Sequence, residues 1–172
     1  MQLHFRITLG EKMPSDRQEQ AWALLREAYR AQTEGDYDHA VELYKKSLEL
    51  FPTAEAHTFL GWTYHFQGKI EDAIAECKRA IEVDPEFGNP YNDIGSYLIQ
   101  LEKYDEAIPW LEHAVAAPRY EPRHFPHFNL GRAYAAKGML ARARECFNES
   151  LRLEPRYTLA RQAAENLRRM VN

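Results

Sequence analysis

One stretch of eleven residues recurs along this chain, and the recurrence limits the folds that the chain can adopt. The copies read FLGWTYHFQGK at 59–69, DIGSYLIQLEK at 93–103 and NLGRAYAAKGM at 129–139, so their starts lie 34 and 36 residues apart. Each copy is followed, at the same offset, by an alanine and a second apolar stripe at helical spacing: Ala73, Ala107 and Ala143, with Ala40 marking an earlier copy. Each unit therefore predicts helix, turn, helix, and such units must stack because one hairpin cannot bury its apolar face alone.

The period and pattern resemble the tetratricopeptide repeat, whose signature places a large apolar residue, Leu-Gly and Tyr on the first helix and Ala, Phe, Ala and Pro on the second. The resemblance covers residues 21–157. The residues that match are Leu24, Ala28, Ala40, Tyr44, Ser47 and Pro52; then Leu60, Gly61, Tyr64, Ala73, Ala80 and Pro85; then Tyr91, Ile94, Gly95, Leu98, Ala107, Leu111 and Ala114; and finally Leu130, Gly131, Tyr134, Ala143, Phe147, Ser150 and Pro155. It implies an all-α, right-handed α-solenoid of four units, 21–53, 54–87, 88–121 and 124–157, within a repeat domain over 15–157.

The small residues of the pattern have a physical reason that is independent of the family. Gly61, Gly95 and Gly131 stand where the two helices of a unit are expected to cross, and a missing side chain lets the helix axes approach closely. Turns such as QGKIEDA and LEKYDEA place Gly, or Glu102 instead, where a left-handed residue can end the first helix. We therefore expect small and large residues to interlock within each unit.

The ends of the chain depart from the repeat. Residues 3–9, LHFRITL, alternate apolar and polar side chains, so 1–14 is expected to be strand-like or disordered. Ser15 with Gln18 resembles a capping box, which predicts that the first helix begins near residue 16. Residues 158–172 are amphipathic and are predicted to form a C-terminal capping helix.

The third unit also departs from the pattern at two places. It ends in AAPRYEPRHFPHF, which is two residues longer than the period and contains three prolines, so the stacking of units three and four is left open. Pro109 falls within the predicted second helix, where the missing backbone donor predicts a local bend.

Several first helices carry a second stripe of aromatic and polar residues beside the buried one. In a solenoid the first helices line the concave wall, so this stripe predicts a peptide-binding surface. Its candidate residues are Trp22, Tyr29, Thr58, Trp62, His65, Phe66, Asn89, Asn92, Ser96, Phe125, Phe128, Asn129 and Arg132. The alternative is that Trp62 and Phe66 pack against adjacent first helices as part of the core.

The residue types of this wall indicate the kind of ligand. Some members of the family grip a terminal carboxylate with lysines and asparagines, but here the only cations are Arg132 and Arg26. A peptide or protein segment with apolar side chains fits better. We therefore expect a non-catalytic, cytoplasmic adaptor that binds another protein and needs no cofactor.

Charge is distributed unevenly, and this keeps a second function open. Residues 1–118 contain 11 Lys and Arg against 21 Asp and Glu, while residues 119–172 contain 11 against 5. The runner-up hypothesis is a self-assembling scaffold, a homo-oligomer in which the acidic N-terminal surface of one copy docks on the basic C-terminal surface of the next. A nucleic-acid partner is not expected, because the C-terminal arginines are not interleaved with exposed aromatic residues.

Motifs of enzymes and membrane proteins are missing from the sequence. GWTYHFQGK has six residues between its glycines where a phosphate-binding loop has four, and Ile70 replaces the hydroxyl that would bind magnesium. His124 and His127 beside Glu121 lack a fourth ligand for a metal site. No apolar run approaches the roughly 18 residues of a membrane span. Cys77 and Cys146 sit in helical apolar patterns and are expected to be buried thiols in a reducing compartment.

Overall fold

The computed structural model describes residues 15–171, and all regular structure within that range is helical. The predicted strand at 3–9 lies outside the described residues. The helices are α1 (Asp16–Glu34), α2 (Tyr37–Leu50), α3 (Ala54–Phe66), α4 (Ile70–Val83), α5 (Asn89–Gln100), α6 (Tyr104–Ala116), α7 (His124–Ala136), α8 (Leu140–Leu153) and α9 (Thr158–Val171).

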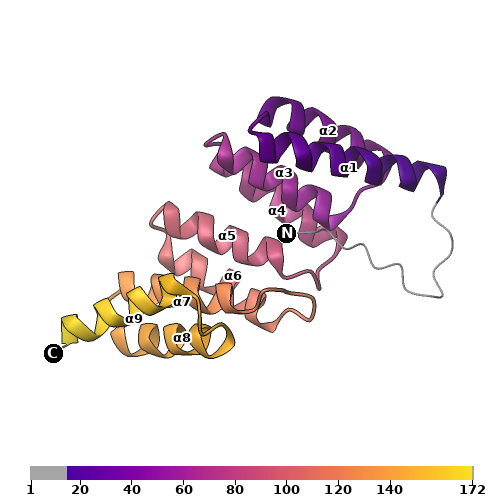
Figure 1. Ribbon diagram of the computed structural model, residues 1–172. Coiled ribbons are helices and arrows are strands. Elements are labelled where there is room, and N and C mark those ends of the chain that lie inside the picture. Colours follow the sequence, from indigo (N-terminus) through magenta and orange to yellow (C-terminus); the bar gives the residue numbers. More distant parts are fainter. Residues whose placement is uncertain (1–14, 172) are drawn as a thin grey trace.

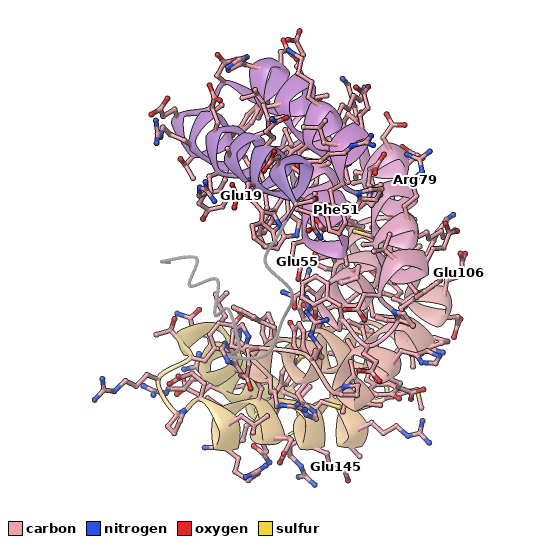
Figure 2. The ribbon with its side chains drawn as sticks, turned by 90° about the vertical axis from the view of Figure 1, so that its right-hand side faces the viewer. Glu19, Phe51, Glu55, Arg79, Glu106 and Glu145 are labelled. Carbon is pink, nitrogen blue, oxygen red and sulfur yellow. The ribbon has the colours of Figure 1, made fainter. Side chains whose placement is uncertain are left out.

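The helices form antiparallel pairs that stack in chain order from α1 and α2 to α7 and α8, with α9 at the end (Figure 1). This arrangement confirms the prediction of an all-α helical repeat solenoid. The stack bends into an arc, with Glu55 of α3 on the inner side and Arg79 of α4 and Glu106 of α6 on the outer side (Figure 2). The first helices α1, α3, α5 and α7 therefore form the inner row, and the second helices form the outer row.

The first helix starts where the capping residues predict. Ser15 accepts a hydrogen bond from the backbone N–H of Gln18, whose side chain accepts one from the Ser15 N–H over 2.9 Å. These bonds satisfy donors that the first turn leaves without a partner. The predicted capping box and the start of α1 at Asp16 are both confirmed.

Close crossing of the paired helices depends on glycine, as predicted. A Cβ atom on Gly95 would lie 2.4 Å from Cγ of Leu111, and one on Gly131 would lie 2.4 Å from Cε1 of Phe147. Both distances are far below van der Waals contact, so a side chain at either position would push the helices apart. The turn residue Glu102 has a φ of 59°, which confirms the predicted left-handed position.

Apolar side chains form two clusters that meet at Tyr64. One lies between units one and two around Tyr44 and Leu60, and the other extends from unit two to α9 around Ile94 and Leu111. Cys77 is buried as predicted, but Cys146 is only half-buried, because it lies on the outer row next to exposed Glu145.

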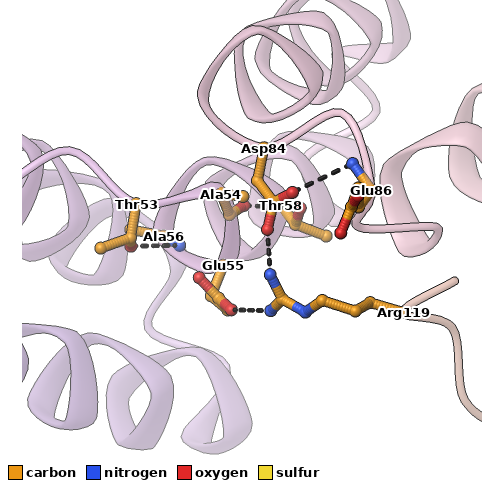
Figure 3. A network of polar contacts seen from close by, with 8 residues as sticks. All are labelled: Thr53, Ala54, Glu55, Ala56, Thr58, Asp84, Glu86 and Arg119. Carbon is orange, nitrogen blue, oxygen red and sulfur yellow. Dashed lines mark hydrogen bonds and ion pairs between the residues drawn. The ribbon is translucent and has the colours of Figure 1, made fainter. Parts of the chain in front are cut away.

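The loop between units three and four packs against the preceding inter-unit loop instead of loosening the stack. Its Arg119 donates hydrogen bonds to Asp84 and to Glu55, the latter over 3.3 Å (Figure 3). The backbone N–H of Gly88 donates to the Arg119 carbonyl over 2.9 Å. A Cβ on Gly88 would lie 2.6 Å from Cβ of Tyr120, which is buried, so glycine is required for this contact. Downstream of this contact, α7 packs on both α5 and α6.

The last helix packs on α8 through buried Ala160 and Leu167. Aligned by its first residue with α3 and α7, α9 carries exposed Glu165 at the position of Gly61 and Gly131. A glutamate there cannot be crossed closely by a further helix. The α9 residues thus favour ending the stack over extending it.

Candidate functional site

One position of the first helices faces the inner side in every unit. It is occupied in turn by Tyr29, Trp62, Ser96 and Arg132, of which the first three are half-buried and the last is exposed. Three large side chains therefore flank one small one. Ser96, on α5, has the smallest side chain of the four.

Trp62 is fixed by a carboxylate of the next unit. Its indole Nε1 donates a hydrogen bond of 2.6 Å to Oδ2 of Asp93, and its ring packs on Phe59 at 5.0 Å between centroids. Burial raises the pKa of Asp93 to about 7, although hydrogen bonds from Trp62 and Asn92 act in the opposite direction. Loss of water around a carboxylate disfavours its charged form, which is the dominant effect here.

Two asparagines continue this line of contacts to the fourth unit. Nδ2 of Asn129 donates to Oδ1 of Asn92 over 2.9 Å, and Arg132 donates to Oδ1 of Asn129 over 3.1 Å. The amides are buried, while the guanidinium is exposed and lies 5.9 Å from the centre of the Phe128 ring. The arginine is thereby held over an aromatic ring on the inner face.

An aromatic cluster closes the C-terminal end of this face. Phe128 packs edge-on against Tyr157 at 5.1 Å between centroids, and Phe125 does so at 5.5 Å. Tyr157 comes from the turn before α9, so two elements build the cluster. We call Trp62, Asn92, Asp93, Ser96, Phe128, Asn129, Arg132 and Tyr157 the inner patch.

Three predicted site residues are placed apart from the inner patch. Thr58 is 1% exposed and gives its hydroxyl to the carbonyl of Ala54 over 2.8 Å, so it offers nothing at the surface. His65 stacks on Tyr97 and contacts Gln100 at the far ends of α3 and α5. Phe66 is 53% exposed and stacks on Tyr37 of the outer row.

The remaining predicted residues lie at the margins. Tyr29 of α1 packs on Phe59 at 5.6 Å between centroids, and Trp22, which is half-buried, lies two turns earlier on the same face of α1. Asn89 and Phe125 stand at or near the starts of α5 and α7 and are half-buried. They extend the inner patch toward the inter-unit loops.

Sequence reasoning missed Asp93 and Tyr157. Asp93, which is half-buried, occupies the position that holds buried Phe59 in unit two and buried Asn129 in unit four. A carboxylate at such a position needs a hydrogen-bond donor, and the sequence could therefore have indicated a bond from a neighbouring residue such as Trp62. Tyr157 follows the last repeat, where the repeat pattern makes no prediction.

The structure gives no support to a metal site or a membrane span in its described part. Burial lowers the pKa of both His124 and His127, and the His124 ring packs 4.2 Å from that of Phe125. Across residues 15–171, no group of three His, Cys, Asp or Glu side chains is arranged to hold a metal ion. No helix within this range has the length and apolarity needed to cross a bilayer.

These observations define a class, a solenoid of helical hairpins with an aromatic and amide-lined inner face. Models of the tetratricopeptide repeat match residues 21–51, 54–87 and 87–155. The chain belongs to the tetratricopeptide repeat family, which confirms the resemblance seen in the sequence.

Several known proteins resemble the chain along much of its length. Small glutamine-rich tetratricopeptide repeat-containing protein 2 of Mycosarcoma maydis is 34% identical over 105 residues, which are 59% of this chain and 30% of that protein. The type IV pilus assembly protein PilF of Pseudomonas aeruginosa is 29% identical over 120 residues, 69% of this chain and 48% of PilF. The chain thus spans less than half the length of these two relatives.

Two solved structures share the fold. A structure of Pseudomonas aeruginosa PilF superimposes with a TM-score of 0.83 at 25% identity, covering 89% of this chain and 69% of that one. YrrB, described as a TPR protein with an unusual peptide-binding site, superimposes with a TM-score of 0.68 at 25% identity, covering 87% and 76%. The family and these neighbours support a repeat module for protein interaction.

Proposed function

We propose that this protein is a non-catalytic interaction module that binds an extended peptide segment of another protein across the inner patch. The observation that carries the proposal is the alignment of Trp62, Ser96 and Arg132 at one position of three successive first helices. Asp93 of the next unit holds the indole of Trp62 by a hydrogen bond. Asn129, one turn earlier on α7, holds the guanidinium of Arg132 in the same way. Pre-organised side chains lose little conformational freedom when a ligand binds.

The chemistry of the inner patch indicates the ligand. Trp62 and Phe128 offer apolar rings, while Arg132 and the amides offer donors and acceptors for a peptide backbone. Because Ser96 is the smallest residue of this line, we expect one apolar ligand side chain to lie above it, between the indole of Trp62 and the guanidinium of Arg132. Burial of such a side chain stabilises a complex by about 1.5–3 kcal/mol before ordering costs.

The test begins with selection of a random peptide library on the immobilised protein, followed by affinity measurement in solution. Ser96→Trp puts a large side chain where the ligand side chain is expected to lie, without removing any core side chain, and Arg132→Glu reverses the one exposed charge of the inner patch. Arg169→Glu makes the same charge change on the exposed face of α9 and serves as the control. We expect Ser96→Trp to weaken binding at least about tenfold, which corresponds to about 1.4 kcal/mol. Peptides that bind this variant as tightly as the native protein contradict the proposal.

Self-assembly is the second candidate function, and a different surface supports it. The charge imbalance between the two parts of the chain favours contact between copies, and an acidic surface beside Phe66 and a basic groove between α8 and α9 support this second proposal. These features do not involve the inner patch.

A further inference from the structure

A groove opens between α8 and α9, at the end of the stack. It encloses about 340 Å³, and its apolar lining comes from Leu140 and Ala141 of α8 and from Ala164 and Leu167 of α9. Arg144 and Arg168 also line it, one from each helix. The groove therefore combines an apolar floor with two guanidinium groups.

Neither arginine has a partner among the described residues 15–171. Within the described part of the chain, neither Arg144 nor Arg168 makes a hydrogen bond, an ion pair or a cation–π contact, and both are exposed. Arg144 holds the position occupied in the first three units by half-buried aliphatic residues that pack on a core cluster, Val41, Ile74 and Ile108. The fourth unit thus carries a charged residue at the position where each earlier unit packs an aliphatic residue on the core.

A feature of opposite character lies where units one and two meet, toward the N-terminal end of the stack. Phe66 is 53% exposed at the end of α3 and stacks on Tyr37, with ring centroids 5.6 Å apart. Asp36 and Asp38 flank Tyr37 and are exposed, and Asp38 accepts a hydrogen bond from Gln67, next to Phe66. We call Phe66, Tyr37, Asp36 and Asp38 the acidic knob. Lys69 lies nearby, but its ammonium donates to Gln67, and the two carboxylates outnumber it.

We propose that the acidic knob of one copy docks into the α8–α9 groove of a second copy, with Phe66 on the apolar floor and the carboxylates facing Arg144 and Arg168. The two features match in both apolar character and charge. Because they lie on different surfaces of one chain, the contact is head-to-tail, and repetition of it builds a ring or a filament. The proposal is independent of peptide binding at the inner patch.

Two other occupants of the groove fit less well. A second helix of a fifth unit would have to cross α9 at Glu165, where α3 and α7 carry glycine. The α9 helix of a second copy would bring Arg161, Arg168 and Arg169 toward Arg144, and like charges repel. The acidic knob meets neither obstacle.

The test measures mass against protein concentration by sedimentation or light scattering, at about 20 mM and about 500 mM salt. We expect association at low salt that weakens at least about tenfold at high salt. Phe66→Ser and the double variant Arg144→Glu, Arg168→Glu should each reduce the association constant at least about tenfold. Arg169→Glu, which reverses an exposed α9 charge outside the groove, is the control and should leave association close to that of the native protein.

A mixing experiment separates docking from general charge effects. Asp38→Lys carries a less acidic knob with a native groove, and the double arginine variant carries a native knob with an acidic groove. Each alone should associate weakly, whereas a mixture should associate more tightly than either. In the mixture the native knob of the double arginine variant meets the native groove of Asp38→Lys, and the introduced lysine meets the introduced glutamates. Circular dichroism verifies that each variant is folded. A native protein that stays monomeric at low salt, or a groove variant that assembles like the control, overturns the proposal.

Discussion

The indole Nε1 of Trp62 donates to Oδ2 of Asp93 over 2.6 Å, which joins α3 of unit two to α5 of unit three on the inner face. Similar side-chain bonds cross the other inter-unit boundaries of the inner row, from Thr63 to Gln32 over 2.8 Å and from Asn129 to Asn92 over 2.9 Å. Polar contacts therefore fix the spacing of the first helices, and apolar packing fills the volume between them.

The raised pKa of Asp93 predicts a pH-dependent stability. In the folded protein the pKa is about 7, whereas an unfolded aspartate has a pKa of about 3.9. Between these values the folded chain holds a proton that the unfolded chain releases, so this group's contribution to stability falls as pH rises from about 4 to about 7. Asp93→Asn keeps an acceptor for Trp62 and removes the titration.

Urea unfolding at pH 5 and pH 8 measures this effect. We expect Asp93→Asn to gain stability relative to the native protein at pH 8 more than at pH 5. Burial also lowers the pKa values of His124 and His127, but both histidines are present in both proteins and do not enter the comparison. An equal difference between the two proteins at both pH values contradicts the assigned pKa.

Gly95→Ala is expected to destabilise the fold by about 1–3 kcal/mol, because its Cβ would collide with buried Leu111. Leu111→Ala alone leaves a cavity and costs about 2–5 kcal/mol. In the double variant the new methyl group enters the space that leucine vacates. The double variant should therefore lose less stability than the two single variants lose together. Strict additivity in chemical denaturation would show that the crossing is not limited by this contact.

The contact between the two inter-unit loops should depend on its backbone more than on its ion pairs. Arg119 is exposed, so Arg119→Ala should cost no more than about 1 kcal/mol. Gly88→Ala places a methyl group against Tyr120 and Ala117 and should cost about 1–3 kcal/mol. Thermal unfolding ranks the two variants, and a larger loss for Arg119→Ala would reverse our assignment of the forces.

Asn129→Ala should destabilise the protein by about 1–3 kcal/mol, since it leaves the buried amide of Asn92 without its donor. In Asn92→Ala, Asn129→Ala both amides are removed together. We therefore expect the double variant to lose less stability than the two single losses added. A complete double-mutant cycle in urea gives the coupling energy, and a value near zero would mean that the bond contributes nothing.

Much of the architecture was predictable because the repeat is periodic. Gly61, Gly95 and Gly131, together with the alanines that follow at constant offset, identify the crossing points, and Ser15 with Gln18 identifies the start of α1. The loop over 117–123 was not predictable, because its proline-rich sequence breaks the period. Its fixed position depends on the Gly88 contact, which links residues far apart in the sequence.

The inner face was predictable only as a set of positions. Helical periodicity tells which residues point inward, but it does not tell how deeply each one is covered. Thr58 and Phe66 belong to the same predicted stripe, yet the first is buried between helices and the second lies exposed beside Tyr37. The bond of Trp62 to Asp93 depends on the offset between neighbouring units, which the sequence of a single helix does not contain.

The central claim, that the inner patch binds a peptide, is tested most directly by the indole N–H resonance of Trp62 in a proton–nitrogen NMR titration. The chain has three tryptophans, so Trp62→Phe assigns this signal. A selected peptide should shift the Trp62 indole signal and the backbone signals of Ser96 and Arg132 in proportion to occupancy. Saturating peptide that leaves these signals in place and shifts only residues of the outer row would contradict the account.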